Sequence, residues 1–178
     1  YDENGETRAV NARVHPTLVP NDHPLATVDK SYNAIFVEAE AAGSLMFYGA
    51  GAGGIQTASA VLGDVVSAAR RDVAGGPGVA ESTHANLPVL PMASVTTRYQ
   101  ITLTVLDEPG VLAAIATLFS DRGVSVEGVS QTVRDDAAAT LVIITHEASE
   151  SALAATVEAL ATTPVVSAVV SVLRVEGL

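Results

Sequence analysis

A glycine-rich loop between a short apolar run and a long periodic segment constrains this chain more than any other feature. The stretch from Leu45 to Asp72 reads LMFYGAGAGGIQTASAVLGDVVSAARRD, with the glycine loop at residues 49–54. Apolar residues with the period of an α-helix follow the loop: Ala58, Val61, Leu62, Val65, Val66 and Ala69. We therefore expect a strand, a glycine loop and a helix from about Gln56 to Asp72. The first N–H groups of such a helix face a ligand, usually an anion.

The residues before this loop predict a β-rich unit. Residues 10–19 carry apolar side chains in partial alternation and favour an extended segment, and a strand is expected from Asn33 to Glu40. Only the tetrapeptide AAGS separates that strand from the apolar run at Leu45, which predicts an antiparallel hairpin. We expect the helix to pack on this hairpin and cover it.

The C-terminal half alternates strand and helix periods. The expected elements are a strand at 99–105, a helix at 111–119, strands at 124–133 and 140–145, a helix after Ser149 and a strand at 165–175. A bulge is expected near Gly128, a hairpin tip at Asp135-Asp136, and Asp107 as a cap of the first helix. The order is βαββαβ, the ferredoxin-like plan. The fold class is therefore α+β: a β-rich piece with one covering helix, then a ferredoxin-like domain.

The composition of the residues between the β-rich unit and the ferredoxin-like unit predicts a linker. Residues 75–94 contain adjacent glycines and several prolines without periodicity, and a short strand is expected near Val89. The predicted division is a first unit at 1–74, a linker at 75–94 and a second unit at 95–178. Because the chain begins with Tyr1 and holds methionine only at positions 46 and 92, we expect it to be a piece of a longer protein.

Charge and composition exclude several classes of function. The formal net charge of −11 argues against nucleic acid and against an anionic membrane surface as partners. No apolar run approaches the ~20 residues of a membrane span, and no secretory signal opens the chain. The chain has no cysteine, which excludes disulfides and thiolate chemistry. The expected location is cytoplasmic.

The glycine loop formally fits the G-x-G-x-x-G pattern of dinucleotide-binding proteins. That reading needs a second parallel strand after the helix with an acidic residue ~20 positions on, and a Pro/Gly stretch follows here instead. We therefore reject a Rossmann fingerprint. A glycine turn needed only for close helix–sheet packing remains an alternative. Asp64, next to the apolar face of the helix, is interpreted as a structural carboxylate.

The histidines predict no metal site. His15, His23, His84 and His146 are scattered along the chain, and their spacing matches no helical or looped ligand pair.

The second unit resembles an ACT domain. The resemblance covers about Thr97–Val175 and is carried by the turn D-E-P-G-V-L at 107–112 within the βαββαβ order. ACT domains are regulatory modules that bind amino acids, usually at a subunit interface. The resemblance implies that backbone N–H groups of Gly110, Val111 and Leu112 hold the carboxylate of an amino-acid effector. Asp107 would hold its ammonium group, and Gln131 is a weaker candidate from the facing strand.

The first unit resembles the C-terminal part of the substrate domain of homoserine dehydrogenase. The resemblance is carried by VHPTLVPNDHPLA at 14–26, NAIFVE at 33–38 and YGAGAGGIQTASAVLGD at 48–64. This family reduces aspartate 4-semialdehyde to homoserine with NADPH or NADH, in the pathway to threonine and methionine. The resemblance implies that the loop approaches the nicotinamide end of NADP or NAD, with Gly53 as the best candidate for a backbone contact and Gly51 and Gly49 as further contacts. Bacterial members often carry an ACT domain after this segment.

The two resemblances together imply a regulated enzyme of which this chain is one part. The family's Rossmann domain and catalytic lysine are not among these residues, and Lys30, the one lysine, does not match the catalytic position. We expect no catalytic residue here, no activity of the 178 residues alone, threonine as the effector, and homo-oligomers through both units. Two alternatives stay open: a stand-alone amino-acid sensor, and an ACT-like unit used only for oligomerisation.

Overall fold

The computed structural model describes residues 9–75, 87–133 and 138–176, and they form two compact units. One unit combines the chain up to Leu18 with Leu87–Leu178, and the other comprises Val19–Asn86. The α+β fold class is confirmed. The boundaries of the compact units, at 18/19 and 86/87, differ from the predicted boundaries at 74 and 94. In particular, the residues before Val19 pack with the C-terminal unit.

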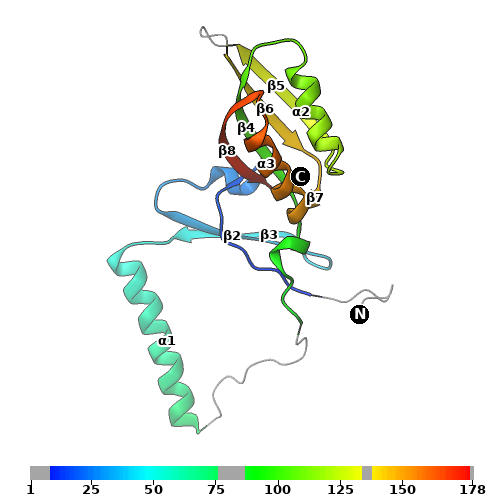
Figure 1. Ribbon diagram of the computed structural model, residues 1–178. Helices are drawn as coiled ribbons and strands as arrows, with labels where there is room; N and C mark the ends of the chain where they lie inside the picture. Colours follow the sequence, from blue (N-terminus) through cyan, green and yellow to red (C-terminus); the bar gives the residue numbers. More distant parts are fainter. Residues whose placement is uncertain (1–8, 76–86, 134–137, 177–178) are drawn as a thin grey trace. The chain divides into compact units, whose positions relative to one another are not determined.

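The C-terminal unit is a mixed sheet with two helices on one face (Figure 1). Its strand order is β1-β8-β4-β6-β5, and β7 pairs with β4. The strands are β1 (Thr17–Leu18), β4 (Thr96–Leu106), β5 (Val126–Val133), β6 (Ala138–Thr145), β7 (Ala148–Ser149) and β8 (Val166–Val175). The helices are α2 (Val111–Ser120) and α3 (Glu150–Thr162), and a 3-10 turn, η2 (Met92–Ser94), precedes β4. The order β4-α2-β5-β6-α3-β8 is the predicted βαββαβ plan.

The core of this unit follows from strict alternation in β4. Ile101, Leu103 and Val105 point to the helices and are fully buried, while the residues between them are half-buried on the other face. The helices pack apolar side chains against these residues: Ile115 and Phe119, one turn apart on α2, and Leu153 and Leu160, two turns apart on α3. The chain has few aromatic residues, so branched aliphatic side chains fill most of this core.

Two local predictions in this unit, a bulge near Gly128 and a cap at Ser149, are confirmed. The register between β5 and β6 shifts between Val126 and Gly128, the position of the predicted bulge. Ser149 caps α3, because its Oγ accepts a hydrogen bond from the N–H of Ala152 at 3.3 Å. The predicted hairpin tip at Asp135-Asp136 lies outside the described residues. Near Val89 there is a single parallel bridge to Val10 in place of a full strand.

A polar network crosses the start of α3. The Glu150 carboxylate accepts hydrogen bonds from the Tyr99 hydroxyl on β4, at 2.8 Å, and from the Arg174 guanidinium on β8. Arg174 also lies over the Tyr99 ring, 5.6 Å from its centroid. Burial, together with the bond to Glu150, raises the pKa of Tyr99 to about 12. Burial alone would raise the pKa of Glu150, but the bonds from Arg174 and Tyr99 lower it overall.

The second unit contains the predicted hairpin. Strands β2 (Tyr32–Ala39) and β3 (Gly43–Ala50) pair antiparallel, with Ile35 opposite Phe47. A 3-10 turn, η1 (Pro24–Thr27), precedes them, and His23 caps this turn. The rings of His23 and Phe36 meet edge to face, with their centroids 4.7 Å apart.

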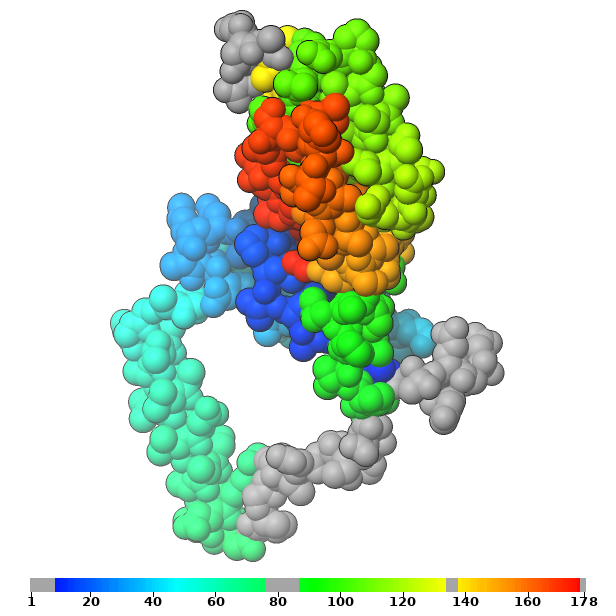
Figure 2. All heavy atoms as spheres, in the orientation of Figure 1, coloured from blue at the N-terminus to red at the C-terminus, as the bar shows by residue number. Residues whose placement is uncertain are grey.

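Helix α1 (Gly54–Ala74) differs from its predicted placement. The helix forms as predicted and ends at Gly75, which has a left-handed conformation, but none of its residues is buried. Its apolar stripe is open, with Val61, Leu62 and Val65 each more than half exposed. Figure 2 shows no atoms of the hairpin along the length of this helix. The apolar period predicted the helix correctly, but the described residues supply no surface against which its stripe packs.

Glu150→Gln should flatten the acid side of the stability profile. The folded-state pKa of Glu150 is lowered, so its carboxylate stabilises the fold above pH 4.5, its ordinary pKa, and this contribution is lost as pH falls further. The variant should be about 1–2 kcal/mol less stable at pH 7, because it loses charge-assisted hydrogen bonds from Arg174. Denaturant unfolding of the chain between pH 7 and pH 3 measures both effects.

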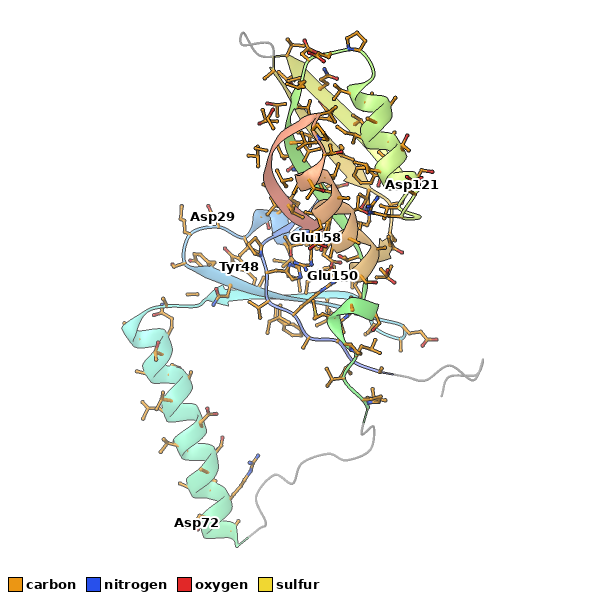
Figure 3. The ribbon with its side chains drawn as sticks, in the orientation of Figure 1. Asp29, Tyr48, Asp72, Asp121, Glu150 and Glu158 are labelled. Atoms are coloured by element: carbon orange, nitrogen blue, oxygen red, sulfur yellow. The ribbon has the colours of Figure 1, made fainter. Side chains whose placement is uncertain are left out.

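The matched control is Glu158→Gln, an exposed carboxylate on the same helix (Figure 3). It should keep the acid-dependent loss of stability seen in the parent chain. Identical pH profiles for the two variants would contradict the role assigned to Glu150.

Candidate functional site

The glycine loop begins where the hairpin opens. Strand β3 ends at Ala50, and the N–H of Gly51 donates to the carbonyl of Ser31 at 3.0 Å, which ties the loop to the start of β2. Tyr32 and Tyr48 stack beside this point with ring centroids 4.9 Å apart. Desolvation, with nearby Tyr32 and Asp29, raises the pKa of Tyr48 (labelled with Asp29 in Figure 3). The loop therefore starts at an end of the hairpin that a hydrogen bond closes and two stacked tyrosines flank.

A small hollow lies at this end of the hairpin. Its volume is about 250 Å³, and the residues that line it are Asn33, Ala34, Ile35, Phe47, Tyr48, Gly49, Ala50 and Gly51. The Asn33 side chain stands directly against Gly51: a Cβ on Gly51 would lie 1.9 Å from the Asn33 Nδ2. The hollow thus combines apolar walls with one amide and the backbone of two glycines, Gly49 and Gly51.

Helix α1 starts at the far side of the loop. Gly53 is its N-cap residue, with φ 142° and ψ 138°, and no side chain caps the helix. The first bond that closes a helical turn runs from the N–H of Thr57 to the carbonyl of Gly53, at 3.0 Å. The N–H groups before Thr57 have no acceptor within the helix and form its positive end. This end can hold a negatively charged or carbonyl group.

The glycines of the loop are required for different reasons. Gly53 has a backbone conformation that disfavours other residues, and a Cβ there would also meet Gln56 Oε1 at 2.2 Å. Gly51 is required by Asn33. A Cβ on Gly49 or Gly54 would meet nothing within 4 Å, and neither has a positive φ. The described chain therefore explains glycine at 51 and 53 but gives no reason for glycine at 49 and 54.

The loop does not belong to a Rossmann unit. The strands before α1 run antiparallel to each other, and the next described strand, β4, belongs to the other compact unit. The rejection of the G-x-G-x-x-G reading therefore agrees with the topology.

A second candidate site lies in the turn from β4 to α2. Gly110 is the N-cap residue of α2 with φ 92°, a left-handed conformation that favours glycine. The N–H of Val111 reaches only the carbonyl of Glu108, at 3.4 Å, and the first helical bond runs from Ala114 to Gly110. Leu112 is exposed. The first N–H groups of α2 thus point out of the helix beside an exposed turn.

The prediction that Asp107 caps α2 is wrong. No side chain caps this helix, because it starts at Val111, four residues beyond Asp107 and after the left-handed Gly110. The Asp107 carboxylate instead accepts a hydrogen bond from the Gln131 amide on β5, at 3.2 Å. The structure therefore brings together the two predicted polar residues, Asp107 and Gln131, at the edge of the exposed turn.

Of the other residues considered in the sequence, Lys30, Asp64 and His15 do not line the hollow. Lys30 is exposed in the turn before β2, with φ 54°, and Asp64 is exposed midway along α1. His15 contacts Thr17, and His84 lies outside the described residues. In the described ranges no three side chains of the metal-binding types gather, and no helix is long and apolar enough to cross a membrane.

Two family models match the chain, in the order the sequence predicts. The homoserine dehydrogenase model matches residues 4–66, and the ACT domain model matches residues 99–164. The chain therefore corresponds to the C-terminal part of a homoserine dehydrogenase with an ACT domain. The first match contains the hairpin, the glycine loop and most of α1, and the second contains the β4–α2 turn.

Proteins with similar sequences are named homoserine dehydrogenase. The chain is 59% identical to a homoserine dehydrogenase of Corynebacterium glutamicum over 168 residues, which are 94% of this chain and 38% of that protein. It is 51% identical to one of Mycobacterium tuberculosis over 96% of this chain and 40% of that protein. The chain thus spans about two fifths of the length of these relatives.

Solved structures of the family share the fold. A homoserine dehydrogenase from Thiobacillus denitrificans matches with a TM-score of 0.84 and 33% identity, over 94% of this chain and 39% of that chain. One from S. aureus, at pH 7.0, matches with a TM-score of 0.51 and 25% identity, over 91% of this chain and 37% of that chain.

Sequence reasoning missed Asn33 and the network around Glu150. The hairpin register places Asn33 opposite Gly49 and so beside the loop, but the sequence shows only an asparagine at the start of a strand. Glu150, Tyr99 and Arg174 lie far apart in sequence and meet only through the sheet order.

Gly51→Ala should displace the Asn33 side chain. The new methyl group would overlap the Asn33 amide, so the side-chain amide resonance of Asn33 should shift in nitrogen–proton NMR spectra. Gly49→Ala, with open space around it, is the matched control and should leave that resonance unchanged. An unchanged Asn33 resonance in Gly51→Ala would contradict the packing described here.

Proposed function

We propose that this chain is the regulatory end of a homoserine dehydrogenase that reduces aspartate 4-semialdehyde to homoserine with NADPH or NADH. The ACT domain binds an amino acid, and threonine, as the pathway end product, is the proposed effector and feedback inhibitor. The proposal includes a homo-oligomer and a cytoplasmic location. The observation that carries it is the succession of both family matches along one chain, over residues 4–66 and 99–164.

The loop residues fit one end of a dinucleotide. The hollow of about 250 Å³ accommodates part of such a cofactor, and the positive end of α1 and the Asn33 amide offer polar contacts. When bound, the nicotinamide supplies or accepts the hydride. Gly49 is the strongest candidate for a close backbone contact, because nothing in the described chain requires glycine there. Gly51 and Gly53 would then shape the loop that presents Gly49.

The turn at the start of α2 fits an amino acid. The N–H groups of Gly110, Val111 and Leu112 suit a carboxylate, since they form the positive end of a helix. Asp107 suits the ammonium group, and the Gln131 amide holds its carboxylate by a hydrogen bond of 3.2 Å. Gly110 leaves the approach open, because nothing lies within 4 Å of the place of its missing side chain.

Gly49→Ala should impair the longer enzyme without weakening this chain. The added methyl group meets nothing here, so the unfolding free energy of the 178 residues should change by less than about 0.5 kcal/mol. In the longer enzyme the same methyl group would stand between loop and cofactor, and the KM for the dinucleotide should rise roughly tenfold. Steady-state kinetics of hydride transfer measures this change.

An unchanged KM for the dinucleotide in the Gly49→Ala variant of the longer enzyme would show that the loop does not bind the cofactor. If the unmodified longer protein did not reduce aspartate 4-semialdehyde, the proposed activity would be wrong and the sensor alternative would be favoured.

Asp107→Asn should weaken threonine binding to this chain. Asparagine keeps an oxygen that accepts from Gln131 but loses the charge that holds the ammonium group, so the Kd should rise about 5- to 30-fold. Isothermal titration calorimetry measures it. Asp121→Asn, at the opposite end of α2, is the matched control and should bind threonine like the parent chain.

No heat of threonine binding in the unmodified chain would exclude threonine as the effector. If truncation before Val95 then also dissociated the longer enzyme, the unit would serve oligomerisation. Equal affinity in the two aspartate variants would place binding elsewhere.

A further inference from the structure

The segment before unit Val19–Asn86 belongs to one family match and packs with the other. Residues 4–66 match the homoserine dehydrogenase model, yet the described part of residues 9–18 is built into the compact unit that contains the ACT domain. Helix α1 and the hairpin, which the same model matches, lie in the other unit. This segment is therefore a part of the homoserine dehydrogenase match that packs with the ACT domain.

Backbone hydrogen bonds hold the segment at two points. Strand β1 adds to β8 in parallel, with Thr17 opposite Arg174 and Leu18 opposite Val175, and the N–H of Glu176 donates to the carbonyl of Leu18 at 2.9 Å. Farther back, the N–H of Leu90 donates to the carbonyl of Val10 at 2.8 Å. The segment thus extends the regulatory sheet beyond the four strands of the ferredoxin-like plan.

A side chain fastens the segment between these points. Arg13 forms an ion pair with Glu176, and only 18% of the Arg13 side chain is exposed. Its Nη1 is fully shielded from solvent, so the guanidinium is inserted into the unit and does not lie along its surface. The charge of Arg13 also reaches Glu150, where it contributes, after the bonds from Arg174 and Tyr99, to the lowered pKa. The contact that fastens the segment is therefore the ion pair of Arg13 with Glu176.

We propose that residues 10–18 form a latch, held by Arg13 and by the pairing of β1 with β8, through which the ACT domain acts on the catalytic region. The effector part of this inference rests on the proposed function. Strand β1 ends at Leu18, and the unit with the hairpin begins at Val19, so no intervening residues absorb a displacement of β8. The predicted linker at 75–94 is then a second connection and not the route of regulation.

Hydrogen exchange of two amides tests the latch in the full chain. The N–H groups of Leu90 and Glu176 report on the two ends of the segment, and the N–H of Tyr99, bonded to Thr145 Oγ1 at 3.0 Å, reports on the core. Arg13→Glu should speed exchange of both reporter amides roughly fivefold and leave Tyr99 unchanged, because it places like charges together. Adding Glu176→Arg should restore slow exchange.

Matched variants separate the latch from a general effect of charge. Arg122→Glu makes the same change of charge in the same unit, where Arg122, in the turn after α2, contacts the Leu118 carbonyl, and should leave the reporter amides unchanged. Glu176→Gln removes the ion pair without placing two negative charges together, and it replaces Arg13→Glu in the test if that variant does not fold. Unchanged exchange at Leu90 and Glu176 in both Arg13→Glu and Glu176→Gln would overturn the latch.

The regulatory role is tested in the longer enzyme. Arg13→Glu should raise the threonine concentration for half-maximal inhibition at least threefold, while the Kd for threonine stays within twofold, and Arg13→Glu with Glu176→Arg should restore inhibition. Inhibition that is unchanged by Arg13→Glu, in an enzyme that threonine inhibits, would overturn the inference alone. An unmodified enzyme that binds no threonine would overturn the proposed effector, while the exchange experiment would still decide whether the latch exists.

Discussion

Strand β4 is the constraint on which the C-terminal unit depends. It pairs with β6 on one side and β8 on the other, and its inward residues Ile101, Leu103 and Val105 are fully buried against both helices. A strand in this position cannot slip, because a shift of one residue would turn its threonines into the core. The turn that carries Asp107 follows one end of β4, and the Tyr99–Glu150–Arg174 network crosses the other. Both features are therefore placed by the same strand.

The sequence predicted what local periods determine. Alternation and apolar runs predicted β2 to β6 and β8, the helical period predicted α1, α2 and α3, and Ser149 marked the start of α3 as a cap; the two-residue strand β7 was not predicted. Contacts between distant residues were not predictable in this way. The bond between Gln131 and Asp107 and the ion pair between Arg13 and Glu176 depend on strand order and register, which leave no mark on either neighbourhood in the sequence.

The glycine loop shows the same limit at the level of a site. Four glycines in six residues predicted a loop, but a pattern does not say why each glycine is there. The structure separates Gly51 and Gly53, which their own neighbours and backbone require, from Gly49 and Gly54, which nothing in the described chain requires. The assignment of Asp107 as a cap failed for a related reason. A left-handed Gly110 delays the helix, and only coordinates reveal that φ.

The unit with the hairpin shows apolar surface that this chain leaves open. Ile35 and Phe47, paired across β2 and β3, are both more than 60% exposed, and so is Leu62 on α1. Contiguous exposed apolar patches are typical of interaction sites. The chain spans about two fifths of its relatives, so the remaining length of such proteins is sufficient to supply the covering surface.

The latch pairs with the end of β8 that lies beside the start of β4, whereas the effector turn follows the end of β4. This distance sets a condition on their coupling. Strand β4 runs from Thr96 to Leu106, roughly 33 Å at 3.3 Å per residue. A packed sheet of this kind does not bend gradually, so a signal along it needs two discrete arrangements with different affinities for the effector. Strand β8 offers a place for such a change, because its pairing with β4 is irregular at two points, between Thr102 and Leu103 and between Thr104 and Val105. Those irregularities lie between the Asp107 turn and the end of β8 that holds β1, so a shift of register there would move the latch while the core side chains of β4 stay in place.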